Sequence, residues 1–159
     1  EIIDLSIHEV KGGSYRIFAS HKGKNKVKAI VKKELSKEIL LELNSHKTWK
    51  NMKKYLDSIK TELRNKIKGH HLCVGYGASA TSTVLQRYFE LEKDITYIID
   101  DNVKRQGLFS PGYGIPIVSD EILSQKPLVL VLAWRHVRYF QHKLVGLPKM
   151  VPLPTFKYE

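Results

Sequence analysis

Residues 74–85, "VGYGASATSTVL", give the clearest indication of the fold. An apolar run reaches two glycines, Gly75 and Gly77, and small and hydroxyl-bearing residues then lead into an expected helix over residues 79–91. A buried strand, a glycine turn and a helix in this order are typical of the first unit of a parallel α/β sheet. The question is whether the turn holds a ligand or simply joins the strand to the helix.

Further apolar runs extend this unit toward the C-terminus. "ITYIID" ends at residue 100, "LVLVLAW" at residue 134 and "KMVPLP" at residue 154, with helices expected after Ser119 and over residues 136–145. Strands that are apolar throughout, alternating with helices, indicate a parallel sheet covered on both faces. The sequence therefore predicts an α/β fold, a small Rossmann-like parallel sheet with flanking helices.

The preceding residues follow different patterns. Apolar and polar residues alternate over residues 1–21 around Gly12 and Gly13, which predicts a β-hairpin. Helices are expected at about 34–43 and from residue 45 to 68, the second with an apolar stripe spaced by three and four. We expect three parts: a hairpin (1–21), a basic linker with amphipathic helices (22–69) and the Rossmann-like domain (70–159). The stripe consists of Trp49, Met52, Leu56, Ile59, Leu63 and Ile67.

The charge lies mostly in the first half of the chain. The net charge is +11, and residues 1–70 hold 17 Lys and Arg against 8 Asp and Glu. Such a surplus is compatible with nucleic acid, acidic lipid or a phosphorylated ligand. The lysines have mixed spacing, without the interleaved arginines and aromatics that read bases, which argues against nucleic acid. No apolar run is long enough to cross a membrane and no signal peptide is present, so we expect a cytoplasmic fragment of a longer protein.

Cysteine and histidine offer little chemistry. The single cysteine, Cys73, lies in an apolar run and is expected to be a buried thiol. The seven histidines are scattered, without the spacing of metal ligands, so no metal site is expected.

Candidate binding residues gather where the parallel strands would end. Glycine and serine follow the first strand (75–79), two aspartates and an asparagine the second (100–102), and Trp134 and Arg135 the third. Backbone amides of residues 78–80, at a helix N-terminus, could face an anion, with Lys104 and Arg105 nearby. Small residues are equally required for close strand–helix packing, and "GYGAS" departs from G-x-G-x-x-G, so both readings remain open. Trp134 is either a stacking surface or an apolar plug.

Several of these segments together resemble a known family. "GYGASATSTVLQRYF", "YIIDDNVKRQGLFSPGYGIPIVSDEIL", "LVLVLAW" and "MVPLP" occur in the order found in the C-terminal domain of S-adenosylmethionine-dependent C-methyltransferases that act on nucleotide-linked deoxysugars. "KGGSYRIFAS" is similar to the "HGGSLR" segment that ends their methyltransferase domain. The resemblance covers about residues 10–20 and 71–154.

The resemblance implies a missing N-terminal methyltransferase domain that binds S-adenosylmethionine and methylates a sugar carbon next to a keto group. This chain alone would then hold no cofactor and no catalytic residue, would transfer no methyl group, and would help to bind the nucleotide-sugar or a similar small polar substrate. The implied substrate-binding residues are Gly75, Gly77, Ala78, Ser79, Thr81, Asp101, Asn102, Lys104, Gln106, Pro111, Gly112 and Trp134.

The chain departs from the family pattern at three places. Lys11 replaces the histidine of "HGGS", which weakens a catalytic role for the hairpin; Arg135 replaces the asparagine after "AW"; and "ASATST" lacks a lysine. Two alternatives stay open: an assembly module without a ligand, which would form a homodimer through the 49–67 stripe, and an independent dinucleotide-binding domain.

Overall fold

The computed structural model describes residues 1–10 and 13–159, so Lys11 and Gly12 of the expected turn lie outside the described residues. Packing divides the chain into two compact units, Glu1–Tyr55 and Leu56–Glu159. The boundary between the units falls inside one helix and so differs from the boundaries expected from the sequence. The division into three parts stays a prediction. In the first unit and across the boundary the elements are β1 (Ile2–His8), β2 (Ser14–Ala19), α1 (Ala29–Leu40) and α2 (His46–Ile67). The second unit continues with β3 (Cys73–Tyr76), α3 (Ala80–Phe89), β4 (Tyr97–Ile99), β5 (Ile117–Val118), the 3-10 helix η2 (Asp120–Gln125), β6 (Leu128–Val131), η3 (Trp134–His136), α4 (Val137–Phe140), η4 (Gln141–Leu144), β7 (Lys149–Val151) and β8 (Lys157–Tyr158).

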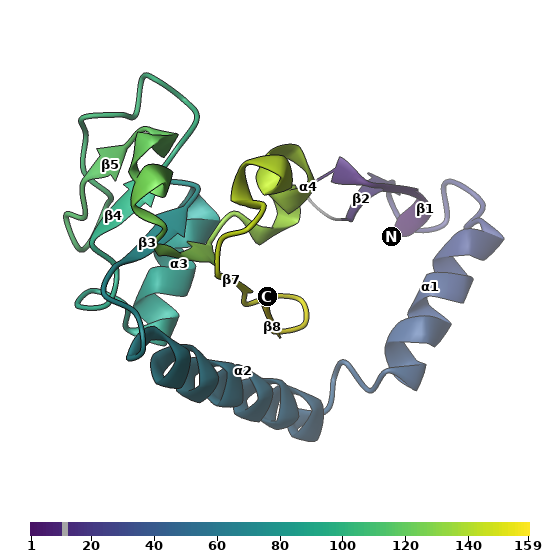
Figure 1. Cartoon of the computed structure of the whole chain (residues 1–159). Helices are drawn as coiled ribbons and strands as arrows, with labels where there is room; N and C mark the ends of the chain where they lie inside the picture. Colours follow the sequence, from purple (N-terminus) through teal and green to yellow (C-terminus); the bar gives the residue numbers. More distant parts are fainter. Residues whose placement is uncertain (11–12) are drawn as a thin grey trace. The chain divides into compact units, whose positions relative to one another are not determined.

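The second unit is built on a six-stranded sheet in the order β5-β4-β3-β6-β7-β8. Figure 1 labels each of these strands except β6. β3 to β7 run parallel to one another: Val74 of β3 lies opposite Tyr97 of β4 on one side and Val129 of β6 on the other. The predicted α/β fold with a parallel sheet and flanking helices is confirmed. β8 was not expected, and it adds one antiparallel strand to the edge of β7.

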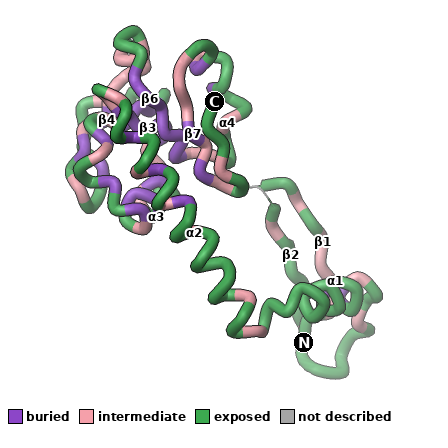
Figure 2. Tube along the Cα trace, turned by 60° about the horizontal axis from the view of Figure 1, so that its bottom comes forward, coloured by how far each residue is buried: buried purple, intermediate pink, exposed green. Residues whose placement is uncertain are grey.

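Helices cover both faces of this sheet, and successive strand residues alternate between the two faces. Ile59 and Leu63 of α2 and Leu85 of α3 pack with Leu128 and Leu130 on one face. Phe140 and Leu144, from the helical segment after β6, pack with Val129 and Val131 on the other. Figure 2 shows the buried residues concentrated on the central strands. Two-sided burial explains why the strands are apolar throughout.

The apolar stripe of α2 divides at the boundary between the units. Ile59, Leu63 and Ile67 are buried against the sheet, whereas Trp49 and Met52 are about half exposed. One continuous periodic pattern thus covers two environments, because only the last part of α2 lies on the sheet.

The first unit is a small layer of hairpin and helix. β1 and β2 pair antiparallel with Leu5 opposite Ile17, which confirms the hairpin, and α1 packs on β1. The Tyr15 hydroxyl donates to Glu34 of α1 over 2.9 Å, and Lys37 donates to the same carboxylate over 2.6 Å. The apolar core of this layer is small, because Val31 is its one buried hydrophobic residue among those described.

Two helices differ from expectation. α1 begins at Ala29 rather than near residue 34. The sequence did not indicate this start, because Lys28 at the N-cap makes no side-chain capping bond. The expected helix over 136–145 is three short pieces, η3, α4 and η4. The short helix after Ser119 is present as η2, although the Ser119 side chain makes no capping bond.

Candidate functional site

The carboxyl ends of β3, β4 and β6 meet at one edge of the sheet. The Gly77 amide donates to the Ile99 carbonyl over 2.7 Å, and the Ala133 amide donates to the Tyr76 carbonyl over 2.9 Å. These bonds bring the loops after the three strands together, as expected for a parallel sheet. We call this edge, formed by residues 76–81, 100–106 and 133–135, the carboxyl rim.

Asp100 is the centre of the carboxyl rim. Its carboxylate accepts from the Ala78 amide over 2.7 Å, from the Asn102 amide over 2.9 Å and from Arg105 Nη1 over 3.0 Å. The residue is only 7% exposed, so these three donors supply the hydrogen bonds that water would otherwise give. Asp100 therefore fastens the loop after β3 to the loop after β4.

The start of α3 is also occupied by the chain itself. Ser79 and Ser82 form a reciprocal capping box, in which the Ser79 hydroxyl accepts from the Ser82 amide over 3.2 Å. The Ala78 amide already holds the Asp100 carboxylate. Asp100 thus takes part of the place that an external anion would take at this helix N-terminus.

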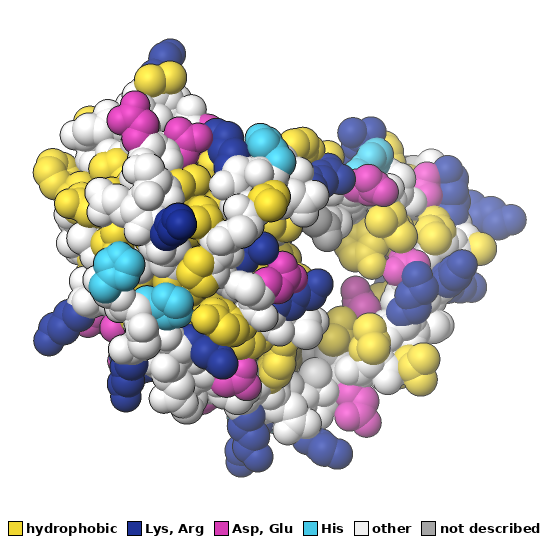
Figure 3. Space-filling model, viewed as in Figure 1, with side chains coloured by type: hydrophobic (Ala, Val, Ile, Leu, Met, Phe, Trp, Pro, Cys, Tyr) yellow, Lys and Arg dark blue, Asp and Glu magenta, His cyan; other side chains and the backbone are white. Residues whose placement is uncertain are grey.

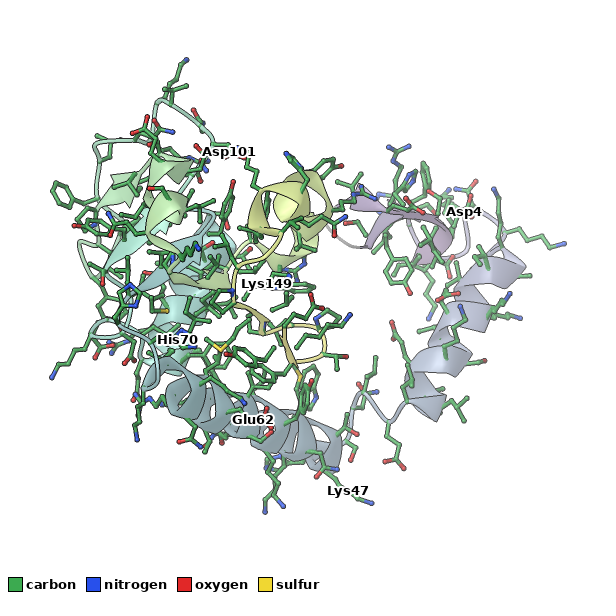
Figure 4. All side chains as sticks on the ribbon, in the orientation of Figure 1. Asp4, Lys47, Glu62, His70, Asp101 and Lys149 are labelled. Carbon is green, nitrogen blue, oxygen red and sulfur yellow. The ribbon has the colours of Figure 1, made fainter. Side chains whose placement is uncertain are left out.

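A second polar cluster surrounds Asp101 beside the helical segment after β6. The Asp101 carboxylate accepts from the Tyr76 hydroxyl over 2.8 Å and from Lys143 Nζ over 2.9 Å, and Lys143 also reaches Asp120 over 2.8 Å. Figure 4 labels Asp101 at its place after β4. The Tyr76 ring stacks on Phe140 with ring centroids 4.2 Å apart. The cluster therefore bonds the ends of β3 and β4 to the helical cover.

The pKa values of this second cluster follow from these contacts. Burial and the hydrogen bond to Asp101 raise the pKa of Tyr76 well above its usual range. Hydrogen bonds to Asp120 and Asp101 raise the pKa of Lys143. Burial alone would raise the pKa of Asp101, but the hydrogen bonds from Lys143 and Tyr76 outweigh it and hold that pKa below its ordinary value. At neutral pH, Tyr76 is therefore neutral, Lys143 is a cation and Asp101 is a carboxylate.

The two glycines of the quoted stretch have packing roles. A Cβ on Gly75 would lie 2.5 Å from Leu132 Cδ1, and Gly77 has φ +97 and faces Ala133. Position 77 requires glycine for the close approach of the loop after β3 to the chain after β6, whereas a Cβ at position 75 would force the Leu132 side chain to shift. Their binding role stays a prediction.

The remaining expected site residues divide into two groups. Thr81, Asn102 and Lys104 are exposed on the carboxyl rim, and Gln106 donates from Nε2 to the Asp100 carbonyl over 2.9 Å. Pro111 and Gly112 lie elsewhere. The chain before them runs antiparallel to the segment that enters β5, so their turn lies toward the amino end of β5, away from the carboxyl rim.

Trp134 lies just after β6 and packs on the cores of both sheet faces. The Arg135 guanidinium stacks over its ring, 4.0 Å from the centroid. A pocket of about 370 Å³ opens beside Trp134, and its wall includes Lys149 and Lys157. Sequence reasoning missed Lys143, Lys149 and Lys157, because single lysines carry no motif and β8 was not expected.

Two further features concern the whole described chain. Among residues 1–10 and 13–159, no group of three or more His, Cys, Asp or Glu side chains is placed to hold a metal ion. Within the same residues, no helix combines the length and the apolar character that a membrane span requires.

Comparison with known proteins bears on this domain as a whole. Residues 9–147 match the family model described as the C-methyltransferase C-terminal domain. No curated protein matches the chain. Because the match spans most of the sequence, from β2 of the hairpin through α1 and α2 to the strands of the carboxyl rim up to β6, the chain belongs to the C-methyltransferase C-terminal domain family.

Proposed function

We propose that this domain binds the nucleotide-sugar substrate of a C-methyltransferase along the carboxyl rim and positions it for methyl transfer. The observation that carries the proposal is the family membership, combined with three loops that converge beside exposed donors. Thr81 in the first turn of α3 and Asn102 and Lys104 in the loop after β4 offer a hydroxyl, an amide and a cation. Ligands of doubly wound sheets bind at this edge, and a sugar diphosphate needs such donors.

The family implies S-adenosylmethionine for the full methyltransferase, and the carboxyl rim does not fit that cofactor. Binding an adenosine in a Rossmann-like fold requires an acidic side chain free to accept the ribose hydroxyls. Asp100 is committed to two amides and Arg105, and Asp101 to Tyr76 and Lys143. Because both carboxylates already accept these hydrogen bonds, they also argue against an independent dinucleotide-binding domain.

The proposal is tested by titrating the chain with a nucleoside diphosphate sugar and following backbone amide shifts by NMR. We expect shifts at the Thr81 and Lys104 loops, and about tenfold weaker binding for Lys104→Met, because one charge-assisted contact is lost. Lys93→Met is the matched control, because this exposed lysine lies in the turn before β4, at the opposite edge of the sheet. Equal losses in both variants, or no binding by the unmodified chain, would contradict the proposal.

A second candidate function is assembly, and the first unit carries the observation that favours it. Most of the exposed large hydrophobic side chains of the chain precede residue 56, among them Ile39 and Leu40 of α1, which are 72% and 83% exposed. Figure 3 shows such side chains on the visible surface of the hairpin and α1. A surface of this kind is typical of a protein–protein contact.

Light scattering with size-exclusion chromatography tests assembly. If α1 forms a contact between copies, Leu40→Gln shifts the chain toward the monomer, whereas Val145→Gln, a similarly exposed site after η4, leaves the mass unchanged. A monomer at every concentration would remove self-assembly from consideration.

A further inference from the structure

The usual ligand crevice of this sheet is closed. The strand order reverses between β3 and β6, which makes their carboxyl ends the topological switch point where doubly wound sheets hold their ligands. Here a Cβ on Gly77 would lie 2.2 Å from the Ala133 Cβ, so the two loops are in direct contact at this point. A flat ring cannot enter between them, and a ligand of this domain must use neighbouring space.

That space lies beside β6, over β7 and β8. The pocket of about 370 Å³ is within the size range of small-molecule sites. Its apolar wall is formed by Trp134, Val137, Val151, Leu153 and Pro154. The Trp134 Nε1 is buried without a hydrogen-bond partner, so the indole offers the pocket apolar surface rather than its N–H. Such a wall suits a flat ring.

The opposite side of the pocket is polar, and its charged side chains are Lys149, Lys157 and Glu159. Lys149, labelled in Figure 4 on β7, forms an ion pair with Glu159 over 3.1 Å, and the backbones of these two residues are hydrogen-bonded in both directions. That pair leaves the Lys157 ammonium of the exposed strand β8 as the excess charge. Gln141, which both donates and accepts, also lines the pocket. An anionic group attached to a ring with polar edges matches this arrangement.

We propose that this pocket binds the nucleoside phosphate part of the substrate, with its base against Trp134 and a phosphate oxygen on Lys157. The inference rests on the proposed function and deepens it, because it moves the nucleotide away from the closed switch point toward β7 and β8. Thr81, Asn102 and Lys104 then contact the sugar end rather than the base. Arg135, stacked on Trp134, holds the ring in place.

Fluorescence provides the test, because the chain has only two tryptophans, Trp49 and Trp134. In a Trp49→Phe background the emission reports Trp134 alone, and titration with uridine 5′-diphosphate is expected to quench it. Lys157→Met is expected to weaken binding about tenfold, as for loss of one charge-assisted contact. Lys93→Met is expected to have no effect. Inorganic pyrophosphate, which has the phosphates but no base, distinguishes the effect of the ring from that of the phosphates. It is expected to leave the Trp134 emission unchanged.

Each outcome separates this inference from the function on which it rests. If a nucleoside diphosphate sugar binds and Lys104→Met weakens it, but neither Trp134 emission nor Lys157→Met responds, the pocket assignment is wrong and the proposed function stands. If pyrophosphate binds as tightly as the nucleotide, the ring subsite is wrong. If no nucleotide and no nucleotide-sugar binds, both proposals fail. Lys157 lies on an exposed two-residue edge strand, so its substitution leaves the core intact.

Discussion

A Cβ placed on Gly77 would lie 2.2 Å from the Cβ of Ala133 and 3.3 Å from its Cα. Real Cβ atoms do not approach so closely, so the contact between the loops after β3 and β6 requires glycine at position 77. The φ of +97 at Gly77 adds a second requirement, because side chains of L-residues clash in that region. The glycine of the quoted stretch therefore joins two loops of the sheet, whatever the domain binds.

Gly77→Ala is expected to destabilise the second unit by about 3–5 kcal/mol, from overpacking together with backbone strain. Gly107→Ala is the matched control, because Gly107 has φ +80 with open space around it and is expected to cost only about 1–2 kcal/mol. Urea unfolding followed by Trp134 emission in the Trp49→Phe background measures both. Adding Ala133→Gly to Gly77→Ala is expected to recover the part of the lost unfolding free energy that comes from overpacking. Equal losses for Gly77→Ala and Gly107→Ala would contradict the close contact.

Asp100 gives a second prediction about the carboxyl rim. Asp100→Asn is expected to cost about 2–4 kcal/mol of unfolding free energy, because a neutral amide cannot satisfy two backbone amides and a guanidinium at once. Arg105→Met removes only the ion pair and is expected to cost less than about 1 kcal/mol, since the arginine side chain is 46% exposed. Urea unfolding measures both variants. Equal costs would show that the ion pair, rather than the two amides, holds the loops together.

Particular residues show what the sequence could predict. The parallel sheet was predictable, because strands buried on both faces must be apolar throughout, as "LVLV" is. The packing face of α1 was not. Leu35, Ile39 and Leu40 have the spacing of one helix face, yet all three are exposed, and Val31 and Glu34 are the buried residues of α1. Periodicity identifies an apolar face without telling which neighbour, in this chain or another, covers it.

The candidate site was predictable in part for a similar reason. Which loops meet follows from strand direction, so residues near positions 77, 101 and 134 could be expected at one edge. That Asp100 rather than a ligand accepts the Ala78 amide depends on side-chain geometry. The position of Pro111 and Gly112 depends on a local antiparallel return of the chain, for which the sequence contains only turn formers.

The Asp101 cluster gives a pH dependence at both ends of the scale. The lowered pKa of Asp101 means that its contribution is present above its unfolded pKa of about 4 and is lost as the pH falls through the folded value. The raised pKa values of Lys143 and Tyr76 have the opposite sense, so their contributions are present below about pH 10 and are lost as the pH rises through the folded values.

Lys143→Met is therefore expected to reduce the unfolding free energy at neutral pH. It is also expected to make the decrease of that free energy at acid and at alkaline pH less steep. The neutral effect is expected to be at most about 1 kcal/mol, because the Asp101 side chain is 51% exposed. Urea unfolding at a series of pH values measures this, with Lys93→Met as the control that keeps the dependence of the unmodified chain. An acid limb unchanged by Lys143→Met would show that the two groups are not coupled in solution.

Cys73 gives the last prediction, because its thiol lies on the face of the sheet covered by α2 and α3. Burial, with a smaller effect of the negative charge of Asp94, raises the pKa of Cys73 to about 12. Thiolate is the reactive form, so the folded chain is expected to react with a disulfide reagent at pH 8 at least about a thousandfold more slowly than the unfolded chain. Reaction then requires opening of the sheet and accelerates with urea. An exposed thiol introduced as Ser124→Cys in a Cys73→Ala background is the control and reacts at once without urea. If Cys73 itself reacts at that rate in the absence of urea, α2 and α3 do not hold this face of the sheet closed.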